Sequence, residues 1–332
     1  MTTMRAVVMH ETGGPEVLAV EDVPCPAPGA GQLLVRTEAV AVSAGETMMR
    51  SGAYPLPVAL PAVIGAEAAG TVTEVGEGAD PGLVGSRVVM VTGGVGSYAE
   101  YVAVSQGMTA VIPDGLSSID AVAGAGAGAM ALGLAQIGTL SGGETVLVEG
   151  GSGKIGGYLI RRAKQLGAGK IIATASTPDG QQRARDLGAD VIADHSQPNW
   201  PAQLRDQLGD TTVDVAFDLS GGAIPAQLLD LLTPSTGRLV LYGTLTADPA
   251  SLDGNTIRER GVRLIGCGGP GWFTDILTVQ YPAFLNAAAA GQFAAPPIET
   301  VLPLAQAADA HRLIEQQPTS GRIILAPTDQ PS

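Results

Sequence analysis

A glycine-rich turn near the middle of the chain could bind a phosphate group. Gly151, Gly153 and Gly156 form a G-x-G-x-x-G pattern between the apolar run "TVLV" and a helical segment. In dinucleotide-binding folds the first glycine permits a tight turn, and the second lets the backbone approach a pyrophosphate. The third lets the helix pack on the strand, and the first N–H groups of the helix face the anion. The pattern predicts a dinucleotide site; the alternative is a turn that only closes a βα connection.

The second glycine is followed by Lys154 and Ile155, at a point where such a turn usually keeps its backbone bare. The Lys154 ammonium could reach a phosphate as a point charge. Its aliphatic stem could instead lie over the turn and fill the volume that a cofactor needs. The sequence leaves both interpretations open, and we count both residues with the predicted cofactor site.

The end of the next predicted strand favours NADPH over NADH. NAD-preferring folds place an acidic residue at this strand end, where it binds the ribose hydroxyls. Here the strand end carries Thr174, Ser176 and Thr177, with no acidic residue before Asp179. Ser176 and Arg183 could supply a hydroxyl and a cation to a 2′-phosphate, or these residues could cap the next helix.

The chain has two patterns of predicted secondary structure, one in its first third and another in its middle part. Before about residue 120, short apolar runs broken by proline and glycine predict an antiparallel barrel or sandwich. From about Thr145, apolar strands alternate with helical segments, which predicts a parallel sheet covered on both faces. The tail carries a helix near "AQAADAHRLIEQQ" and a closing strand, "GRIILA". We predict an α/β fold with segments 1–120, 121–268 and 269–332, the middle one binding the dinucleotide.

Composition excludes several classes of partner. The chain has 332 residues, enough for two domains, and its 18 basic and 32 acidic residues give a formal charge of -14. Such a surface repels nucleic acid and anionic membranes, so we expect a small-molecule substrate. Cys25 and Cys267 are too few for a disulfide framework, and the N-terminus is not a secretory signal. These features predict a cytoplasmic protein.

One uncharged stretch, residues 121–140, is long enough to cross a bilayer. It is rich in alanine and glycine, which are weak formers of membrane helices. We therefore expect a buried helix at a domain junction, where small side chains permit close packing.

Motifs along almost the whole chain resemble the zinc-independent quinone oxidoreductase branch of the medium-chain dehydrogenase/reductases, which includes zeta-crystallin-like enzymes. They include "GAEAAGTVTEVGEG", "GSYAEYVAV", "LSGGETVLVEGGSGKIGG" and "SGRIIL". The resemblance implies a GroES-like β-barrel catalytic domain built from both chain ends, with a doubly wound Rossmann domain between them. It also implies an NADPH-dependent reductase of a quinone or an α,β-unsaturated carbonyl, and a homodimer formed through the edge strand "VRLIGCG".

The resemblance extends to individual residues. Four residues of the loop that resembles the family's substrate loop are the predicted catalytic set: Ser43, Glu46, Arg50 and Tyr54. Tyr242 and Gly243 are expected near the nicotinamide. Each loop residue could equally have a turn or packing role. Zinc-dependent relatives have a G-H-E pattern where this chain has Gly65, Ala66 and Glu67, and its histidines are scattered, so we predict no metal site.

Several residues depart from the family pattern and weaken the expectation of a cofactor. Ser43 and Glu46 replace Asn and Asp, while Ala129 and Ala131 replace a threonine and an aromatic residue. Gly180 aligns with the lysine that binds the 2′-phosphate, and Asp194 and His195 align with a Tyr-Arg pair. An alternative is a cofactor-independent member that catalyses a cyclisation, dehydration or isomerisation, with Glu46, Glu149 and Lys154 as acid–base candidates. A non-catalytic binding protein is a third possibility.

Overall fold

The computed structural model describes residues 2–54, 58–243, 248–316 and 321–327. The chain forms two compact units, Met1–Gly126 with Leu277–Ser332 and Ala127–Ile276. Both boundaries lie a few residues beyond those expected from the sequence. The first falls inside one continuous helix, α2 (Ser118–Ile137), which a change in strand pattern does not reveal.

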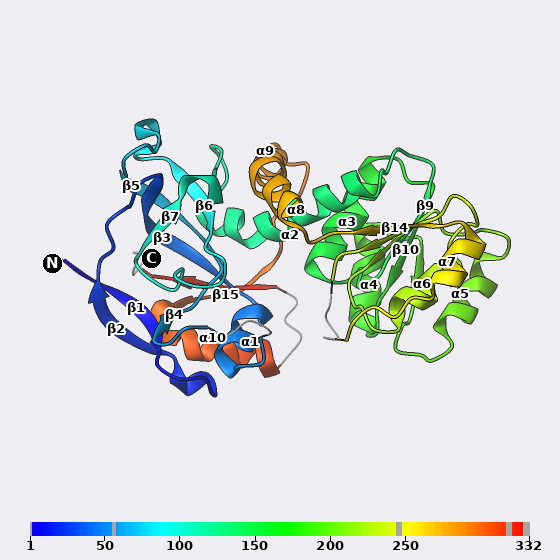
Figure 1. Cartoon of the computed structure of the whole chain (residues 1–332), viewed down its shortest axis with the longest axis horizontal. Helices are drawn as coiled ribbons and strands as arrows, with labels where there is room; N and C mark the ends of the chain where they lie inside the picture. The colour runs from blue at the N-terminus through cyan, green and yellow to red at the C-terminus, as the bar shows by residue number, and fades with distance from the viewer. Residues whose placement is uncertain (1, 55–57, 244–247, 317–320, 328–332) are drawn as a thin grey trace. The chain divides into compact units, whose positions relative to one another are not determined.

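The first unit is a β-barrel-type domain completed by both ends of the chain (Figure 1). Its larger sheet has seven strands in the order β15-β16-β3-β5-β6-β8, and β7 also pairs with β3. The strands of this sheet are β3 (Gln32–Val42), β5 (Glu67–Val75), β6 (Arg87–Val91), β7 (Tyr101–Ser105), β8 (Thr109–Val111), β15 (Ile298–Pro303) and β16 (Arg322–Ala326). The C-terminal strand β16 pairs antiparallel with β3, with Ile323 opposite Val42. This confirms the GroES-like fold expected from the resemblance.

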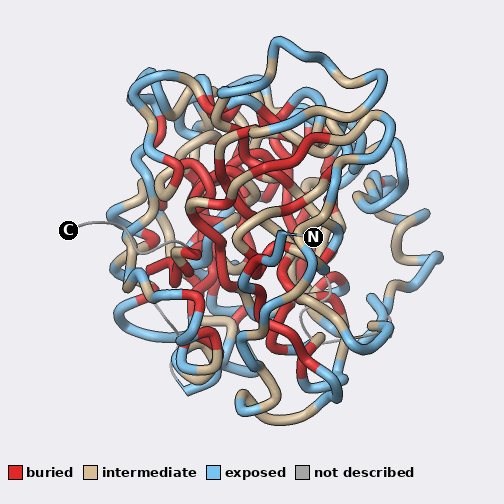
Figure 2. The backbone as a smooth tube through the Cα atoms, turned by 90° about the vertical axis from the view of Figure 1, so that its left-hand side faces the viewer, coloured by how far each residue is buried: buried red, intermediate tan, exposed pale blue. Residues whose placement is uncertain are grey.

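A smaller sheet and three helices cover this domain. The sheet has the order β2-β1-β4. Its strands are β1 (Thr3–Met9), β2 (Ala19–Pro24) and β4 (Ala62–Val63), and the helices are α1 (Ala44–Ser51), α9 (Tyr281–Ala289) and α10 (Ala307–Gln316). Alternate residues of the strands point inward, and the core is built from Val, Leu, Ile and Ala side chains with few aromatic rings. Figure 2 shows these buried strand segments among exposed turns.

Helix α10 is fixed to the barrel by a buried histidine. The His311 side chain is 0% exposed, and its Nε2 lies 3.1 Å from the Tyr98 hydroxyl. Burial, with a contribution from the Arg50 guanidinium, lowers the pKa of His311 to about 4. Arg50 of α1 is itself buried and pairs with Glu315 of α10. The tail helix predicted from "AHRLIE" therefore docks through polar groups as well as apolar ones.

The second unit is a doubly wound parallel sheet with the strand order β11-β10-β9-β12-β13-β14. The strands are β9 (Thr145–Val148), β10 (Lys170–Thr174), β11 (Val191–Ala193), β12 (Val215–Asp218), β13 (Arg238–Leu241) and β14 (Arg263–Gly266). The helices are α3 (Lys154–Gln165), α4 (Pro178–Leu187), α5 (Trp200–Leu208), α6 (Ile224–Leu231), α7 (Gly254–Arg260) and α8 (Pro270–Asp275). Every residue of β9 and β12 is buried, because helices cover both faces of the sheet. The strand order reverses between β9 and β12, which is where ligands bind in such sheets.

Helix α2 is the uncharged stretch that has the length of a membrane span. Among the described residues it is the one helix long and apolar enough to cross a bilayer, with a mean hydropathy of 1.4. Within its most apolar window, 67% of the residues are buried inside the protein. Ala129 and Ala131 belong to this buried surface. This degree of burial is typical of a core helix.

Candidate functional site

The turn after β9 packs tightly against β10. The Gly150 N–H donates to Thr174 Oγ1 at 2.9 Å, and the Gly151 N–H donates to the Thr174 carbonyl at 3.0 Å. A Cβ atom on Gly151 would lie 2.5 Å from Ala173 Cβ. A Cβ atom on Gly156 would lie 2.3 Å from the Gly150 carbonyl oxygen, closer than real Cβ contacts. Both positions therefore require glycine, and the first turn of α3 lies directly on the loop.

Helix α3 begins at a glycine, whose lack of a side chain leaves it unable to cap the first N–H groups. Its N-cap residue, Gly153, is extended, with φ -77° and ψ 176°, and makes no side-chain capping hydrogen bond. Gly153 and Lys154 are exposed and Ile155 is half-buried. A helix N-terminus carries partial positive charge and free N–H donors. The bare backbone, these N–H groups and the exposed lysine together fit a pyrophosphate.

The end of β10 offers an exposed hydroxyl beside a helix with its own cap. Thr177 is the N-cap of α4, and its Oγ1 accepts a hydrogen bond from the Gly180 N–H at 3.1 Å. Ser176 is exposed and Arg183 is half-buried on α4. A Cβ atom on Gly180 would lie 3.1 Å from Ser152 Oγ, so this glycine lets α4 approach the glycine turn. Thr177 supplies the N-cap of α4, so the exposed hydroxyl of Ser176 is not needed for that role.

A buried carboxylate joins three strand ends of this sheet. Glu149 follows β9, and its side chain is 1% exposed. Its Oε1 lies 2.9 Å from His195 Nδ1, and its Oε2 accepts a hydrogen bond from the Leu219 N–H at 3.2 Å. His195 follows β11 and Leu219 follows β12, so one carboxylate spans the switch point of the sheet.

A second carboxyl group and a phenol lie near Glu149. Asp218 ends β12, and burial, with repulsion from Glu149, raises the pKa of its carboxyl group to about 6. The Tyr242 hydroxyl is buried and has no hydrogen-bond partner among the residues that the structure describes. Burial, followed by Glu149 and Asp218, raises the pKa of Tyr242, which keeps its proton on the hydroxyl. A Cβ atom on Gly243 would lie 2.0 Å from the Leu219 carbonyl oxygen, so this residue requires glycine.

Two of the predicted catalytic residues form a helix cap in the first unit. Ser43 is the N-cap of α1, and its Oγ accepts a hydrogen bond from the Gly45 N–H at 3.2 Å. The Glu46 carboxylate accepts bonds from the Ser43 N–H at 3.0 Å and from the Ser43 hydroxyl. Its other oxygen accepts from the Ala66 N–H at 3.1 Å. These bonds form a capping box that fixes the start of α1.

The other two predicted catalytic residues do not join this pair. The Arg50 side chain turns to Glu315 of α10. Tyr54 follows α1 and is half-buried, and its backbone N–H donates to the Met48 carbonyl at 3.1 Å. The structure therefore brings Ser43 together with Glu46 and gives Arg50 a partner from the far end of the chain.

Glu67 is the last residue of the segment Gly65-Ala66-Glu67, which aligns with the G-H-E pattern of zinc-dependent relatives. Its carboxylate accepts a hydrogen bond from the Tyr281 hydroxyl at 3.0 Å and lies 3.8 Å from Arg322 Nη2. Burial raises the pKa of Glu67. Within the described parts of the chain, no three His, Cys, Asp or Glu side chains gather in a way that could hold a metal ion.

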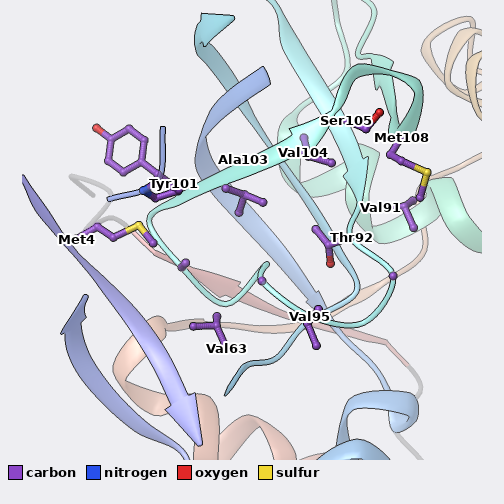
Figure 3. A pocket seen from close by; sticks show the side chains of 15 residues that line it. Met4, Val63, Val91, Thr92, Val95, Tyr101, Ala103, Val104, Ser105 and Met108 are labelled. Atoms are coloured by element: carbon purple, nitrogen blue, oxygen red, sulfur yellow. The ribbon is translucent and has the colours of Figure 1, made fainter. Parts of the chain in front are cut away.

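An apolar cavity of about 400 Å³ lies in the first unit, between β7 and the loop after β6 (Figure 3). Its side chains include Met4, Val63, Val95 and Met108. None of the predicted site residues lines it.

Reasoning from the sequence alone missed the pairing of Glu149 with His195. Glu149 was expected only as an acid–base candidate, and His195 was noted only as one of two residues that align with a Tyr-Arg pair of the family. The two residues are far apart in the chain, and the strand order β11-β10-β9 brings them together. The position of each residue directly after a strand was the available signal, because the carboxyl ends of parallel strands lie along one edge.

Comparison with known proteins identifies both units. Residues 29–114 match the family model for the alcohol dehydrogenase GroES-like domain, and residues 155–283 match the model for zinc-binding dehydrogenases. The chain is 30% identical to the quinone oxidoreductase of Rattus norvegicus, over 97% of each chain. It is also 30% identical to the 2-haloacrylate reductase of a Burkholderia species, over 98% of this chain and 99% of that protein.

Solved structures agree with the sequence matches. The quinone oxidoreductase of Escherichia coli, solved as a complex with NADPH, superposes with a TM-score of 0.86 at 26% identity. The match covers 97% of this chain and 100% of that chain. The fold, the motifs and these similarities lead to one conclusion. The chain is an oxidoreductase that belongs to the quinone oxidoreductase, or zeta-crystallin-like, branch of the medium-chain dehydrogenase/reductase superfamily.

Proposed function

We propose that this protein is an NADPH-dependent, zinc-independent reductase of a quinone or an α,β-unsaturated carbonyl compound. The observation that carries the proposal is the turn after β9, where Gly151 and Gly156 leave no room for a Cβ atom and α3 begins at a glycine that has no side chain to cap it. The Escherichia coli relative was solved with NADPH, and the Burkholderia relative reduces a 2-haloacrylate. Both support this class of reaction.

Different residues of the chain bind different parts of the cofactor. The N–H groups at the start of α3 and the Lys154 ammonium bind the pyrophosphate. Ser176 and Arg183 bind the 2′-phosphate, and Tyr242 and Gly243 lie at the nicotinamide end. When bound, NADPH supplies a hydride.

In the first unit, we propose that the Tyr54 hydroxyl donates to the oxygen that becomes negative, and that Ser43, whose one hydroxyl proton is donated to Glu46, helps to orient the substrate loop. Glu46 holds the Ser43 hydroxyl in place through the capping box. Arg50 holds α1 against α10. Glu46 and Arg50 thus act by positioning the loop.

Titration with NADPH and with NADH, followed by nicotinamide fluorescence, tests the proposal. We expect saturable binding of NADPH at micromolar concentration. No binding up to millimolar concentration would overturn the reductase. That result would favour the cofactor-independent alternative, for which the Asp218 carboxyl, with a pKa of about 6, is suited to proton transfer.

The Lys154→Ala variant should bind NADPH about tenfold more weakly, because one charge-assisted contact with phosphate is lost. The matched control is Lys164→Ala, which removes an exposed lysine near the other end of the same helix. Its affinity should equal that of the original protein. Tighter binding by Lys154→Ala would show that the side chain occupies the cofactor's volume instead.

We also propose a homodimer formed through β14, which is the last strand of the parallel sheet and has an exposed edge. Leu264 on this strand is 38% exposed. Leu264→Asp should therefore halve the mass measured by light scattering. Val84→Asp, at an exposed site in the first unit, should leave the mass unchanged. A monomeric mass for the original protein would contradict the proposal.

A further inference from the structure

The imidazole of His195 lies across the ends of three neighbouring strands. Its Nδ1 is 2.9 Å from Glu149 Oε1 and 3.1 Å from Thr174 Oγ1. Glu149 follows β9, Thr174 ends β10 and His195 follows β11. The His195 side chain is 24% exposed, whereas Glu149 is buried beneath it. The pair thus has a buried end and an accessible end.

The hydrogen-bond partners determine which nitrogen of His195 faces outward. A carboxylate oxygen accepts hydrogen bonds, so the Glu149 contact places a proton on Nδ1. Thr174 Oγ1 accepts a bond from the Gly150 N–H at 2.9 Å, and it lies 3.1 Å from Nδ1, whose single proton it can share with Glu149. The other nitrogen, Nε2, lies on the far side of the ring from these groups. It can meet a ligand.

Thr174 places this imidazole beside the expected ribose site. In a doubly wound fold the ribose of the dinucleotide lies at the end of the second strand, which here is β10. Thr174 is its last residue and contacts both the glycine turn and His195. Ser176 is exposed two residues later. Both Glu149 oxygens are occupied, by His195 and by the Leu219 N–H, so Glu149 does not present a carboxylate to ribose hydroxyls.

We propose that His195, held by Glu149, binds the 2′-phosphate of NADPH through Nε2 and so discriminates NADPH from NADH. This inference rests on the proposed function, since it concerns the same cofactor site. His195 is the binding group and Glu149 is a positioning residue that acts through it. With Nδ1 donating to the Glu149 carboxylate, a protonated Nε2 can donate a charge-assisted hydrogen bond to a phosphate oxygen.

The neighbouring acidic residue does not oppose this role. Among the residues that the structure describes, Glu149 from the turn after β9 and Asp194 from its own turn are charged groups that interact with His195. Asp194 accepts hydrogen bonds from the Ser196 hydroxyl at 2.6 Å and from the Ser196 N–H at 3.0 Å. These bonds, with a small contribution from His195, lower the pKa of Asp194. Its carboxylate is held within the 194–197 turn.

The first test compares dissociation constants for NADPH and NADH in His195→Gln and His195→Arg. His195→Gln should weaken NADPH binding about tenfold to a hundredfold and leave NADH binding unchanged. His195→Arg should keep the preference for NADPH. The matched control is His10→Gln, which removes an exposed histidine that also pairs with a glutamate, Glu21, in the other unit. Its ratio of affinities should be that of the original protein.

The second test is Glu149→Gln, which removes the carboxylate that holds His195. It should weaken NADPH binding and leave NADH binding unchanged. In His195→Gln the same substitution should have no further effect on the ratio of affinities, because Glu149 acts through His195.

The outcomes separate the two claims. If NADPH and NADH both bind and His195→Gln leaves their ratio unchanged, the inference is overturned and the proposed function stands. Additive effects of Glu149→Gln and His195→Gln on the ratio of affinities would also overturn it. If neither dinucleotide binds, the proposed function fails first. Retained NADH binding shows that each variant is folded.

Discussion

Replacing Gly156 by alanine should weaken NADPH binding at least about a hundredfold and lower the free energy of unfolding by about 3 kcal/mol. The new Cβ atom would lie 2.3 Å from the Gly150 carbonyl oxygen and 2.9 Å from Gly151 Cα. All of these neighbours are backbone atoms, so no flexible side chain can move aside. The turn and the start of α3 must separate, and the N–H groups that we propose face the pyrophosphate lose their positions. Fluorescence titration and denaturant unfolding measure the two effects.

The control for this substitution is Gly254→Ala. Gly254 is the first residue of α7 in the same unit, and a Cβ atom there would meet no atom within 4 Å. Its effect on the free energy of unfolding should stay within about 0.5 kcal/mol, and NADPH binding should not change. If Gly156→Ala bound NADPH as tightly as the original protein does, the turn after β9 would not be the pyrophosphate site.

Because His311 is buried as a neutral group, it should lower the free energy of unfolding by about 3 kcal/mol as the pH is lowered from 6.5 to 4. His311 is neutral and buried in the folded protein, where its pKa is about 4, against the usual 6.5 in the unfolded chain. Between these values the unfolded chain takes up a proton that the folded protein does not. The stabilising effect is complete above pH 6.5 and is lost as the pH falls toward 4. Urea unfolding at a series of pH values measures it.

Comparison with His311→Gln isolates this contribution, since other groups also titrate. Asp218, with its pKa raised to about 6, acts in the opposite direction: its contribution is complete below pH 3.8 and is lost as the pH rises through 6. His311→Gln retains Asp218 but should lose less stability than the original protein between pH 7 and 4. His10→Gln replaces a histidine that is 62% exposed, and this variant should lose as much stability between pH 7 and 4 as the original protein. Equal slopes for the original protein and His311→Gln would contradict the assignment.

Local pattern and motif resemblance predicted the elements and the fold. The alternation of apolar strands and helices predicted the parallel sheet, and the run "GRIILA" predicted the strand that became β16. The spacing of Ser43 and Glu46 is that of a capping box, and this local signal could have been recognised in the sequence. It was instead interpreted as a change in the family's catalytic pattern, since capping residues and catalytic residues are of the same types.

Contacts between distant parts of the chain could not be predicted in the same way. Arg50 and Glu315 are 265 positions apart, and nothing in either local sequence names the other. Glu149 and His195 meet because of the strand order, and the depth at which Glu149 is buried follows from helix packing on both faces of the sheet. The resemblance could give the fold but not these pairs. His195 is a position at which this chain departs from the family, and Arg50, which matches the family pattern, was expected to act in the substrate loop.

The pairing of β16 with β3 has a consequence for the order in which the chain can fold during synthesis. In the sheet, β16 lies between β15 and β3, yet it is the last strand to leave the ribosome. The second unit is one continuous segment, Ala127–Ile276, and all of its strands are available earlier. The N-terminal half of the barrel therefore waits, with one edge of β3 open, while the segment translated after it is already able to fold. Translation reverses the usual order, in which the first domain made is the first to be completed.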